Sequence, residues 1–240
     1  MSSHKSQLRW REWVADGTMA FAFAKPPGFT HQAGQSVLLT LPDPPETDST
    51  GNSRTFTIAS APYEPELLIA TRLRDTAFKR VLQSMPLGTN VRLEGPAGEM
   101  LLDDDDGRPV VLLAGGIGIT PFLAMARHAT QAGLTHQITL FYANRRPEDA
   151  AFLAELTGMT TVNPKLHLIA IMSDAQKSAQ TWAGESGHIN RELLVRHLPD
   201  LFSPLYYFAG PPAMTMAMQE MLAGIGIAEA DMRYEAFYGY

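Results

Sequence analysis

Hydrophobic positions in the first hundred residues fall into short runs, and glycine, proline, aspartate or asparagine separates each run from the next. Such runs predict strands, and several in close succession favour a small antiparallel β-barrel. One helix is predicted at 76–84, because a polar cap (Thr76 or Asp75) precedes apolar positions that share one helix face. The predicted strands lie at 36–41, 56–59, 67–71 and 91–93.

After residue 109 the pattern changes, and fully apolar runs alternate with longer helical stretches. Continuous apolar strands separated by helices are typical of a parallel sheet that helices cover on both faces. We therefore predict an α/β doubly wound parallel sheet for the second part of the chain. Its predicted strands lie at 110–114, 138–143, 166–172 and 205–209, and its predicted helices at about 121–131, 147–156, 190–197 and 212–223.

An acidic run, Asp103–Asp106, followed by Gly107, separates the two patterns. Four consecutive acids suggest a calcium loop, but the spacing of an EF-hand is absent, so we interpret the run as a solvated turn between domains. A chain of 240 residues is long enough for two modest domains. We expect a β-barrel domain over 1–104 and an α/β domain over 105–240.

Composition and charge exclude several classes of protein. The chain has no cysteine, which excludes disulfides, thiolate zinc sites and cysteine-ligated iron–sulfur clusters within it. Its 19 basic and 25 acidic residues give a net charge of −6, so we expect no nucleic-acid partner. The histidines lack the spacing of a metal site, and we expect no metal. Residues 1–7 are polar, unlike a secretory signal, so we expect a cytoplasmic protein. Glycines interrupt the longest uncharged stretch, 109–126, so we expect no membrane span.

Two turns that contain glycine follow predicted apolar strands. The first, Ala114–Pro121, opens a helix, and in that context a backbone turn approaches a pyrophosphate while helix N–H groups face the anion. It lacks the third glycine of the Rossmann fingerprint and the Gly-Lys-Ser/Thr of a P-loop, and a plain strand-to-helix turn is the alternative. The second turn is Ala209–Met214. Because the carboxyl ends of parallel strands meet at one edge of the sheet, we expect both turns to converge on one crevice.

The barrel segment at 54–60 combines an arginine, an aromatic ring and two hydroxyls on one predicted strand. Alternation along a strand places Arg54 and Phe56 on one face and Thr55 and Thr57 on the other. Such a set is suited to a phosphate and a flat ring system. An ordinary edge strand is the alternative interpretation.

Together, these motifs resemble those of the ferredoxin–NADP reductase-like flavoprotein oxidoreductase family over nearly the whole chain. Arg54–Thr57 resembles the family's Arg-x-Tyr-Ser/Thr flavin motif, with Phe56 in place of the usual tyrosine. Ala209–Met214 is similar to its Cys-Gly-Pro-Pro-x-Met turn, with alanine in place of cysteine. The other matching segments are Gly34-Gln35, Gly95–Gly98, Gly115–Pro121 (the family's Gly-Gly-x-Gly-x-Thr-Pro turn) and Glu235–Tyr240 (its Glu-x-Phe-x-Gly-Tyr ending).

The resemblance implies FAD in the barrel and NAD(P)H on the sheet, with the flavin ring in the crevice between the domains. It implies that Arg54 contacts a flavin phosphate, that Thr57 contacts flavin N5, and that Phe56 and Phe237 stack on the two ring faces. Thr57, Glu235 and Phe237 are the candidate catalytic residues. The further candidates for flavin binding are Thr55, Thr71, Arg72, Leu73, Thr76 and Ala77. The candidates for binding the nicotinamide coenzyme are Gly116, Gly118, Thr120, Pro121, Arg145, Ser173, Asp174, Gly210, Pro211 and Met214.

In the family that the chain resembles, the choice between NADH and NADPH depends on residues that follow the second and third strands of the sheet. Arg145 and Arg146 are candidates for a clamp on the 2′-phosphate of NADPH, and a solvated loop is the alternative. Asp174 stands where NADP-specific relatives have arginine, and its carboxylate repels a phosphate. We therefore expect a narrow preference for NADH.

The expected function is an FAD-dependent NAD(P)H oxidoreductase that passes electrons to a separate acceptor. Because the chain has no cysteine for a fused iron–sulfur centre, ferredoxin or flavodoxin is the expected acceptor. Arg72, Arg74, Lys79 and Arg80 form either a docking patch for an acidic carrier or a solvated helix face. One alternative function is an electron-transfer flavoprotein subunit of a larger redox complex, and another is a nucleotide-binding regulatory module without flavin. We expect a monomer or weak oligomer.

Overall fold

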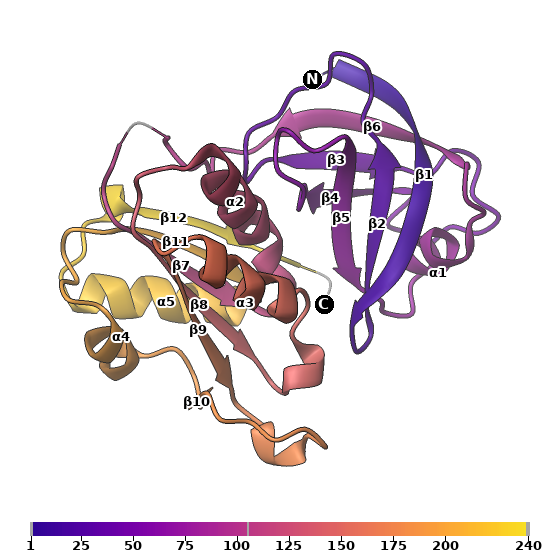
Figure 1. Cartoon of the computed structure of the whole chain (residues 1–240). Coiled ribbons are helices and arrows are strands. Elements are labelled where there is room, and N and C mark those ends of the chain that lie inside the picture. Colours follow the sequence, from indigo (N-terminus) through magenta and orange to yellow (C-terminus); the bar gives the residue numbers. More distant parts are fainter. Residues whose placement is uncertain (1, 105, 239–240) are drawn as a thin grey trace.

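Six antiparallel strands form the N-terminal domain in a computed structural model, which describes residues 2–104 and 106–238 (Figure 1). The strands are β1 (Ser2–Ala15), β2 (Thr18–Ala24), β3 (Ser36–Thr40), β4 (Ser53–Thr57), β5 (Glu66–Arg72) and β6 (Asn90–Ala97). They are hydrogen-bonded in the order β4-β3-β6-β1-β2-β5. The sheet curls toward closure, because the Ala59 N–H just beyond β4 donates to the Leu68 carbonyl of β5 at 2.7 Å. The predicted antiparallel barrel is confirmed.

Strands β1 and β2 had no counterpart among the predicted elements. β1 is a long and only partly exposed strand, and its charged residues leave no continuous apolar run in the sequence. β2 is almost fully buried, but alanine fills every second position from Ala20 to Ala24, and alanine is a poor indicator of strands. Both strands lie next to each other in the sheet, between β6 and the edge strand β5.

The one helix of the barrel domain, α1 (Ala77–Ser84), follows the prediction closely. The Thr76 hydroxyl caps its N-terminus by accepting a hydrogen bond from the Lys79 N–H at 3.3 Å. The apolar face of α1, with Phe78 and Val81, is buried in the same cluster as the inward side chains of the barrel strands. The helix thus packs on the barrel core.

The C-terminal domain is a six-stranded parallel sheet with helices on both faces (Figure 1). Its strands are β7 (Val110–Gly115), β8 (Ile138–Asn144), β9 (Leu166–Met172), β10 (Glu185–Ser186), β11 (Leu205–Gly210) and β12 (Met232–Ala236). Its α-helices are α2 (Ile119–Ala132), α3 (Leu153–Val162), α4 (Arg191–His197) and α5 (Pro212–Gly224). The strand order is β10-β9-β8-β7-β11-β12.

The two faces of the sheet carry separate cores. Alternate residues of β7 enter the two cores, so that Leu112 packs with α2 and α3 while Leu113 packs with α4 and α5. Four short 3₁₀ turns complete the domain: η1 (Gly116–Gly118), η2 (Pro147–Asp149), η3 (Ala175–Lys177) and η4 (Glu229–Asp231). The predicted doubly wound parallel sheet is confirmed.

The C-terminal domain differs from the prediction in one helix and two short strands. The predicted helix at 147–156 is instead the turn η2 followed by α3, because Phe152 has a left-handed φ of 60° that interrupts helical hydrogen bonding. The edge strand β12, which pairs in parallel with β11, was not predicted. The two-residue strand β10 was also not predicted.

A shared apolar core joins the two domains. Ala59, Leu68 and Ala70 of the barrel belong to the same buried cluster as Phe122 and Met125 of α2. Helix α2 therefore lies at the junction, next to the barrel (Figure 1). Among the described residues, no helix has the length and apolar character needed to span a membrane.

Candidate functional site

A cavity of about 460 Å³ opens between the barrel and the parallel sheet. The barrel contributes the whole of the Arg54–Thr57 segment, together with side chains from β5 and α1. The sheet domain contributes the turn that opens α2 and the residues after β12. The lining residues that sequence analysis singled out are Arg54, Thr55, Phe56, Thr57, Thr71, Thr76, Thr120, Glu235 and Phe237. The structure therefore brings candidates from distant parts of the chain together at one place.

Alternation along β4 sorts its side chains as predicted. Arg54 and Phe56 both contact the ring of Phe78 on α1: the Arg54 Cζ lies 5.0 Å from its centroid, and the Phe56 centroid lies 6.0 Å from it. Thr57 is buried at the carboxyl end of the strand, whereas Thr55 is exposed. The strand thus presents a cation and a ring from one face and hydroxyls from the other.

The loop before β4 surrounds the Arg54 guanidinium. Its Nη1 donates to the carbonyl oxygens of Thr50 (2.9 Å), Gly51 (3.0 Å) and Ser53 (2.7 Å). Its Nη2 forms an ion pair with Asp48 at 3.4 Å. An anion at this point must therefore compete with loop carbonyls for the guanidinium, although three-quarters of the Arg54 side chain is already withdrawn from water.

Lys79 is a cavity residue that sequence analysis treated only as part of a basic surface cluster. Its Nζ donates to the Arg72 carbonyl at 2.8 Å from a position that lines the cavity. Burial, together with the nearby charges of Arg74 and Arg54, lowers its pKa to about 8. The sequence could have pointed to Lys79 as a cavity residue through its position, because it lies three residues after the cap Thr76, in the first turn of α1.

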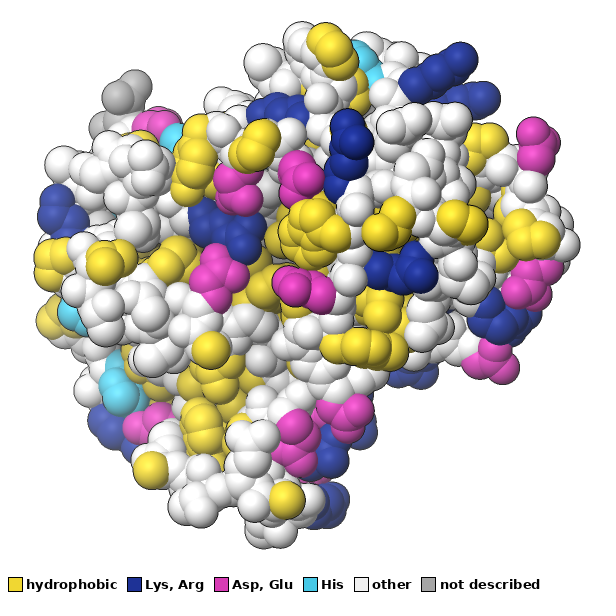
Figure 2. All heavy atoms as spheres, turned by 45° about the vertical axis from the view of Figure 1, so that its right-hand side comes forward, with side chains coloured by type: hydrophobic (Ala, Val, Ile, Leu, Met, Phe, Trp, Pro, Cys, Tyr) yellow, Lys and Arg dark blue, Asp and Glu magenta, His cyan; other side chains and the backbone are white. Residues whose placement is uncertain are grey.

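The basic cluster does not form a continuous patch. Arg72 pairs with Asp149 of the other domain at 3.8 Å, and Arg80 is held by Glu46 and Asp75. On the face drawn in Figure 2, basic and acidic side chains lie next to one another and no large area of one sign is seen. Of the two earlier alternatives, these ion pairs favour the solvated surface over a docking patch.

Three residues expected to bind flavin do not line the cavity. Thr71 lines it, whereas its neighbour Arg72 does not and pairs instead with Asp149 of the other domain. Leu73 packs against the barrel core. Ala77 is buried in the first turn of α1. Their contact with the cofactor stays a prediction.

The two glycine turns meet, as predicted. A methyl group on Gly118 would lie 2.2 Å from the Ala209 carbonyl oxygen, and one on Gly115 would lie 2.2 Å from the Met214 sulfur. Only glycine permits this approach of η1 to β11 and α5. The turns bring the N-terminus of α2 to the cavity, where Thr120 is buried and its hydroxyl donates to the Ile117 carbonyl at 3.1 Å. The candidates in these turns that do not line the cavity are Gly116, Gly118, Pro121, Gly210, Pro211 and Met214.

The second turn also holds the segment that follows β12. The Phe237 N–H donates to the Gly210 carbonyl at 2.9 Å, which continues the pairing of β12 with β11. This bond places Glu235 and Phe237 at the cavity, as expected for candidate catalytic residues. Burial raises the pKa of the Glu235 carboxyl. Gly239 and Tyr240, which belong to the terminal motif, lie outside the described residues.

The residues expected to select the coenzyme lie at the carboxyl ends of β8 and β9, outside the cavity wall. The Asp174 N–H donates to the Arg145 carbonyl at 2.8 Å, so these two residues are adjacent, and Ser173 is similarly joined to Asn144. Lys177 pairs with Asp174 at 3.1 Å. Arg146, however, was expected to join a phosphate clamp, and its guanidinium instead forms ion pairs with Asp16, Glu148 and Asp149.

Comparisons with known proteins agree with this architecture. A family model described as an oxidoreductase NAD-binding domain matches residues 112–220. A crystal structure of a ferredoxin NADP⁺ reductase from Neisseria gonorrhoeae, with bound FAD and NADP, superposes with a TM-score of 0.82 at 20% identity and covers 98% of each chain. The chain shares the two-domain fold of ferredoxin–NADP reductase-like oxidoreductases. The cytochrome P450 reductase GcoB of Amycolatopsis has the same fold, with a TM-score of 0.83 at 21% identity over 98% of this chain and 70% of that one.

Curated relatives of the chain include larger proteins. The glycine betaine monooxygenase reductase subunit of Chromohalobacter salexigens is 26% identical over 223 residues, which are 92% of this chain and 60% of the relative. The chain thus spans about three-fifths of the length of that relative. Within the family pattern, the chain departs at Phe56, which lacks a phenol, and at Ala209, which replaces a cysteine.

Proposed function

We propose that the chain is an FAD-dependent NAD(P)H oxidoreductase that passes electrons to a separate acceptor. The observation that carries the proposal is the shared cavity, where Arg54 and Thr57 of the barrel face Thr120 of the glycine turn and Phe237 of the C-terminal segment. Two domains that each bind part of a redox pair need such a junction, because hydride transfer requires the reacting atoms to lie within van der Waals contact.

The barrel side of the cavity fits FAD. Arg54, Lys79 and the N-terminus of α1 at Thr76 supply donors and positive charge for a diphosphate. Phe56 supplies an aromatic face, and Thr57 supplies a hydroxyl at the point where β4 ends. FAD, when bound, accepts a hydride from the nicotinamide at flavin N5 and releases the electrons singly or in pairs.

The sheet side fits a nicotinamide coenzyme. The glycine turn before α2 allows the coenzyme's phosphates to approach the backbone and the helix N-terminus. Phe237 lines the cavity from the side of the sheet and is held through its backbone by Gly210. Glu235, whose pKa is raised by burial, provides a carboxyl group beside the same cavity.

A separate redox protein is the proposed electron acceptor, and ferredoxin or flavodoxin is its proposed class. The printed names of the similar proteins support a reductase role: one is the reductase subunit of a monooxygenase and another is a ferredoxin NADP⁺ reductase. The 240 residues contain no cysteine that could ligate an iron–sulfur cluster. The electrons must therefore leave the flavin for a centre that these residues do not provide.

An anaerobic titration tests the proposal. The purified chain is expected to show a flavin spectrum that bleaches within seconds when NADH or NADPH is added. The alternative, an electron-transfer flavoprotein subunit of a larger complex, predicts a yellow chain that neither coenzyme reduces on its own. A colourless chain that does not bind added FAD contradicts both.

A further inference from the structure

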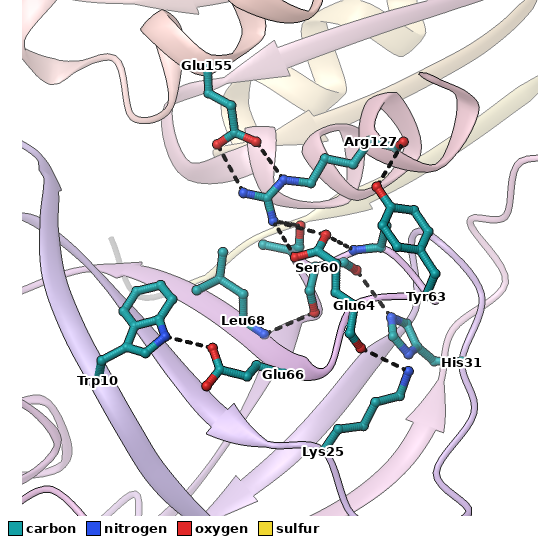
Figure 3. Close-up of polar contacts among 12 residues, drawn as sticks. Trp10, Lys25, His31, Ser60, Tyr63, Glu64, Glu66, Leu68, Arg127 and Glu155 are labelled. Atoms are coloured by element: carbon teal, nitrogen blue, oxygen red, sulfur yellow. Dashed lines mark hydrogen bonds and ion pairs between the residues drawn. The ribbon is translucent and has the colours of Figure 1, made fainter. Parts of the chain in front are cut away.

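Arg127 of α2 connects the two domains outside the cavity (Figure 3). Within its own domain, its guanidinium forms a bidentate ion pair with Glu155 of α3, with distances of 2.6 Å (Nε–Oε1) and 3.0 Å (Nη2–Oε2). Across the junction, its Nη1 lies 3.3 Å from both carboxylate oxygens of Glu64 in the barrel. Only 15% of the Arg127 side chain is exposed. A planar guanidinium suits this double role, because its donors diverge in fixed directions.

The same Nη1 also donates to the Ala59 carbonyl at 3.3 Å, and this contact links Arg127 to the candidate site. Ala59 follows the cavity residue Thr57 by two positions, on the segment that leaves β4. The Ala59 N–H donates to the Leu68 carbonyl at 2.7 Å, and the Leu68 N–H donates to the Ser60 hydroxyl at 3.0 Å. Arg127 therefore contacts a part of the barrel that is already fixed in place.

Glu64 is equally well fixed. Its Oε1 accepts a hydrogen bond from the Ala61 N–H at 2.6 Å. This bond closes the turn and holds the carboxylate over it. The next residue back, Tyr63, donates from its hydroxyl to the Arg127 carbonyl at 3.4 Å. Both the side chain and the backbone of Arg127 are thus joined to the turn at 59–64.

Arg127 and the cavity residue Thr120 share one face of α2. They are seven residues apart, which is two helical turns and a rise of about 10 Å. The helix begins at the glycine turn that meets Ala209, so its first residues belong to the coenzyme side of the cavity. A rotation of α2 about the barrel would move Thr120 relative to Thr57.

We propose that Arg127 is a positioning residue for hydride transfer: it ties α2, which carries Thr120, to the barrel segment that carries Thr57. The inference rests on the proposed function and deepens it. A second junction contact, from Arg146 to Asp16 at 3.0 Å, stays in place when Arg127 is removed. Loss of Arg127 therefore misaligns the domains without separating them, and a misplacement of about 1 Å is enough to slow a reaction about 100-fold.

Reduction kinetics test the proposal first. In Arg127→Met, we expect the limiting rate of flavin reduction at saturating coenzyme to fall about 10- to 100-fold, with flavin content and coenzyme Kd within about three-fold of wild type. Arg127→Lys, which keeps the charge, is expected to recover part of the rate. Arg108→Met is the matched control, because Arg108 also pairs with an acid (Asp231, 2.9 Å) and a carbonyl, but within the sheet domain.

Two glutamate variants test the proposal independently, in case Arg127→Met does not fold. Glu64→Gln weakens the arm that crosses the junction while keeping an oxygen for the Ala61 N–H, and it is expected to slow reduction. Glu155→Gln weakens the arm within the sheet domain, and it is expected to leave the rate closer to wild type. The reverse order of these two effects overturns the proposal.

A distance measurement reports how the two domains are arranged and needs no bound cofactor. Because the chain has no cysteine, Leu87→Cys and Val162→Cys introduce two unique labelling sites, one in each domain, at side chains that are 60% and 70% exposed. Spin-label distances are expected to be narrow in the parent and shifted or broadened when Arg127→Met is added. An unchanged distribution overturns the positioning role. If instead the parent is never reduced by NADH or NADPH, the proposed function fails while the distances still report on Arg127.

Discussion

At the residue scale, the basic side chains that line the cavity, Arg54 and Lys79, differ in their environments. Arg54 is held by the carbonyls of its own loop, whereas Lys79 is half-buried beside Arg72 and has a lowered pKa. Arg54 was found from the sequence because its strand pattern was distinctive. Lys79 was not, because a lysine on a short helix looks like a solvated side chain until its burial is known.

Replacing Arg54 with alanine should remove most of the bound flavin. A charged hydrogen-bonding partner of a partly desolvated phosphate contributes on the order of 2–4 kcal/mol, or roughly 30- to 1,000-fold in affinity. The measurement is flavin content after purification and the Kd for added FAD. Arg108→Ala, which removes an arginine that does not line the cavity, serves as the control. Full occupancy in Arg54→Ala would contradict the assignment.

Lys79 makes a pH-dependent contribution that can be measured. Its pKa in the flavin-free protein is lowered from 10.5 to about 8, so the charged form is already being lost at mildly alkaline pH. A bound diphosphate favours the charged form, and flavin affinity should therefore fall as pH rises through 8. In Lys79→Met, affinity is lower below pH 8 and this additional pH dependence is absent. Parallel pH profiles for the two proteins would exclude the contact.

Coenzyme choice also depends on single residues. Arg146 is engaged by Asp16 and Asp149, which removes one of two candidate phosphate ligands, and Asp174 lies beside Arg145. We expect kcat/KM to favour NADH, because a carboxylate repels the 2′-phosphate. Asp174→Arg should shift the ratio toward NADPH by about ten-fold or more. An unchanged ratio in the variant would show that Asp174 lies away from the phosphate.

At the scale of elements, the strands and helices with clear periodicity were predictable and the others were not. The parallel strands of the second domain were found because they are continuous apolar runs. β1 was not predicted because a partly exposed strand tolerates charged residues. The start of α3 was predicted too early because nothing in the sequence marks Phe152 as a left-handed residue. The convergence of the glycine turns was predictable from topology, but the roles of Arg127 and Arg72 depend on contacts between domains that no local pattern encodes.

The contact between η1 and β11 should not tolerate a methyl group. In Gly118→Ala, the new carbon would lie 2.2 Å from the Ala209 carbonyl oxygen, so the turn must move away from the strand. Overpacking of this kind costs about 1–3 kcal/mol. Gly224→Ala is the matched control, since nothing lies within 4 Å of its added carbon at the end of α5. Thermal unfolding of the two variants measures the difference, and equal midpoints would contradict this account of Gly118.

At the scale of the whole molecule, the two domains share one buried cluster, and this predicts that they unfold together. Ala59 and Leu68 of the barrel pack in the same core as Phe122 of α2, so neither domain can unfold without exposing apolar surface of the other.

The three tryptophans allow a direct test of joint unfolding. Trp10 and Trp13 lie in the barrel, and Trp182 lies in the sheet domain. Trp182→Phe leaves reporters only in the barrel, whereas a double replacement of Trp10 and Trp13 by phenylalanine leaves one only in the sheet domain. Each variant is unfolded in urea and followed by fluorescence and by circular dichroism, which serves as a reference for any stability change. Within each variant, the two probes should give one midpoint, because the shared core couples the domains. A fluorescence midpoint that departs from the circular dichroism midpoint in either variant would show that the junction does not couple them, and Arg127 would then hold together two independently folding units.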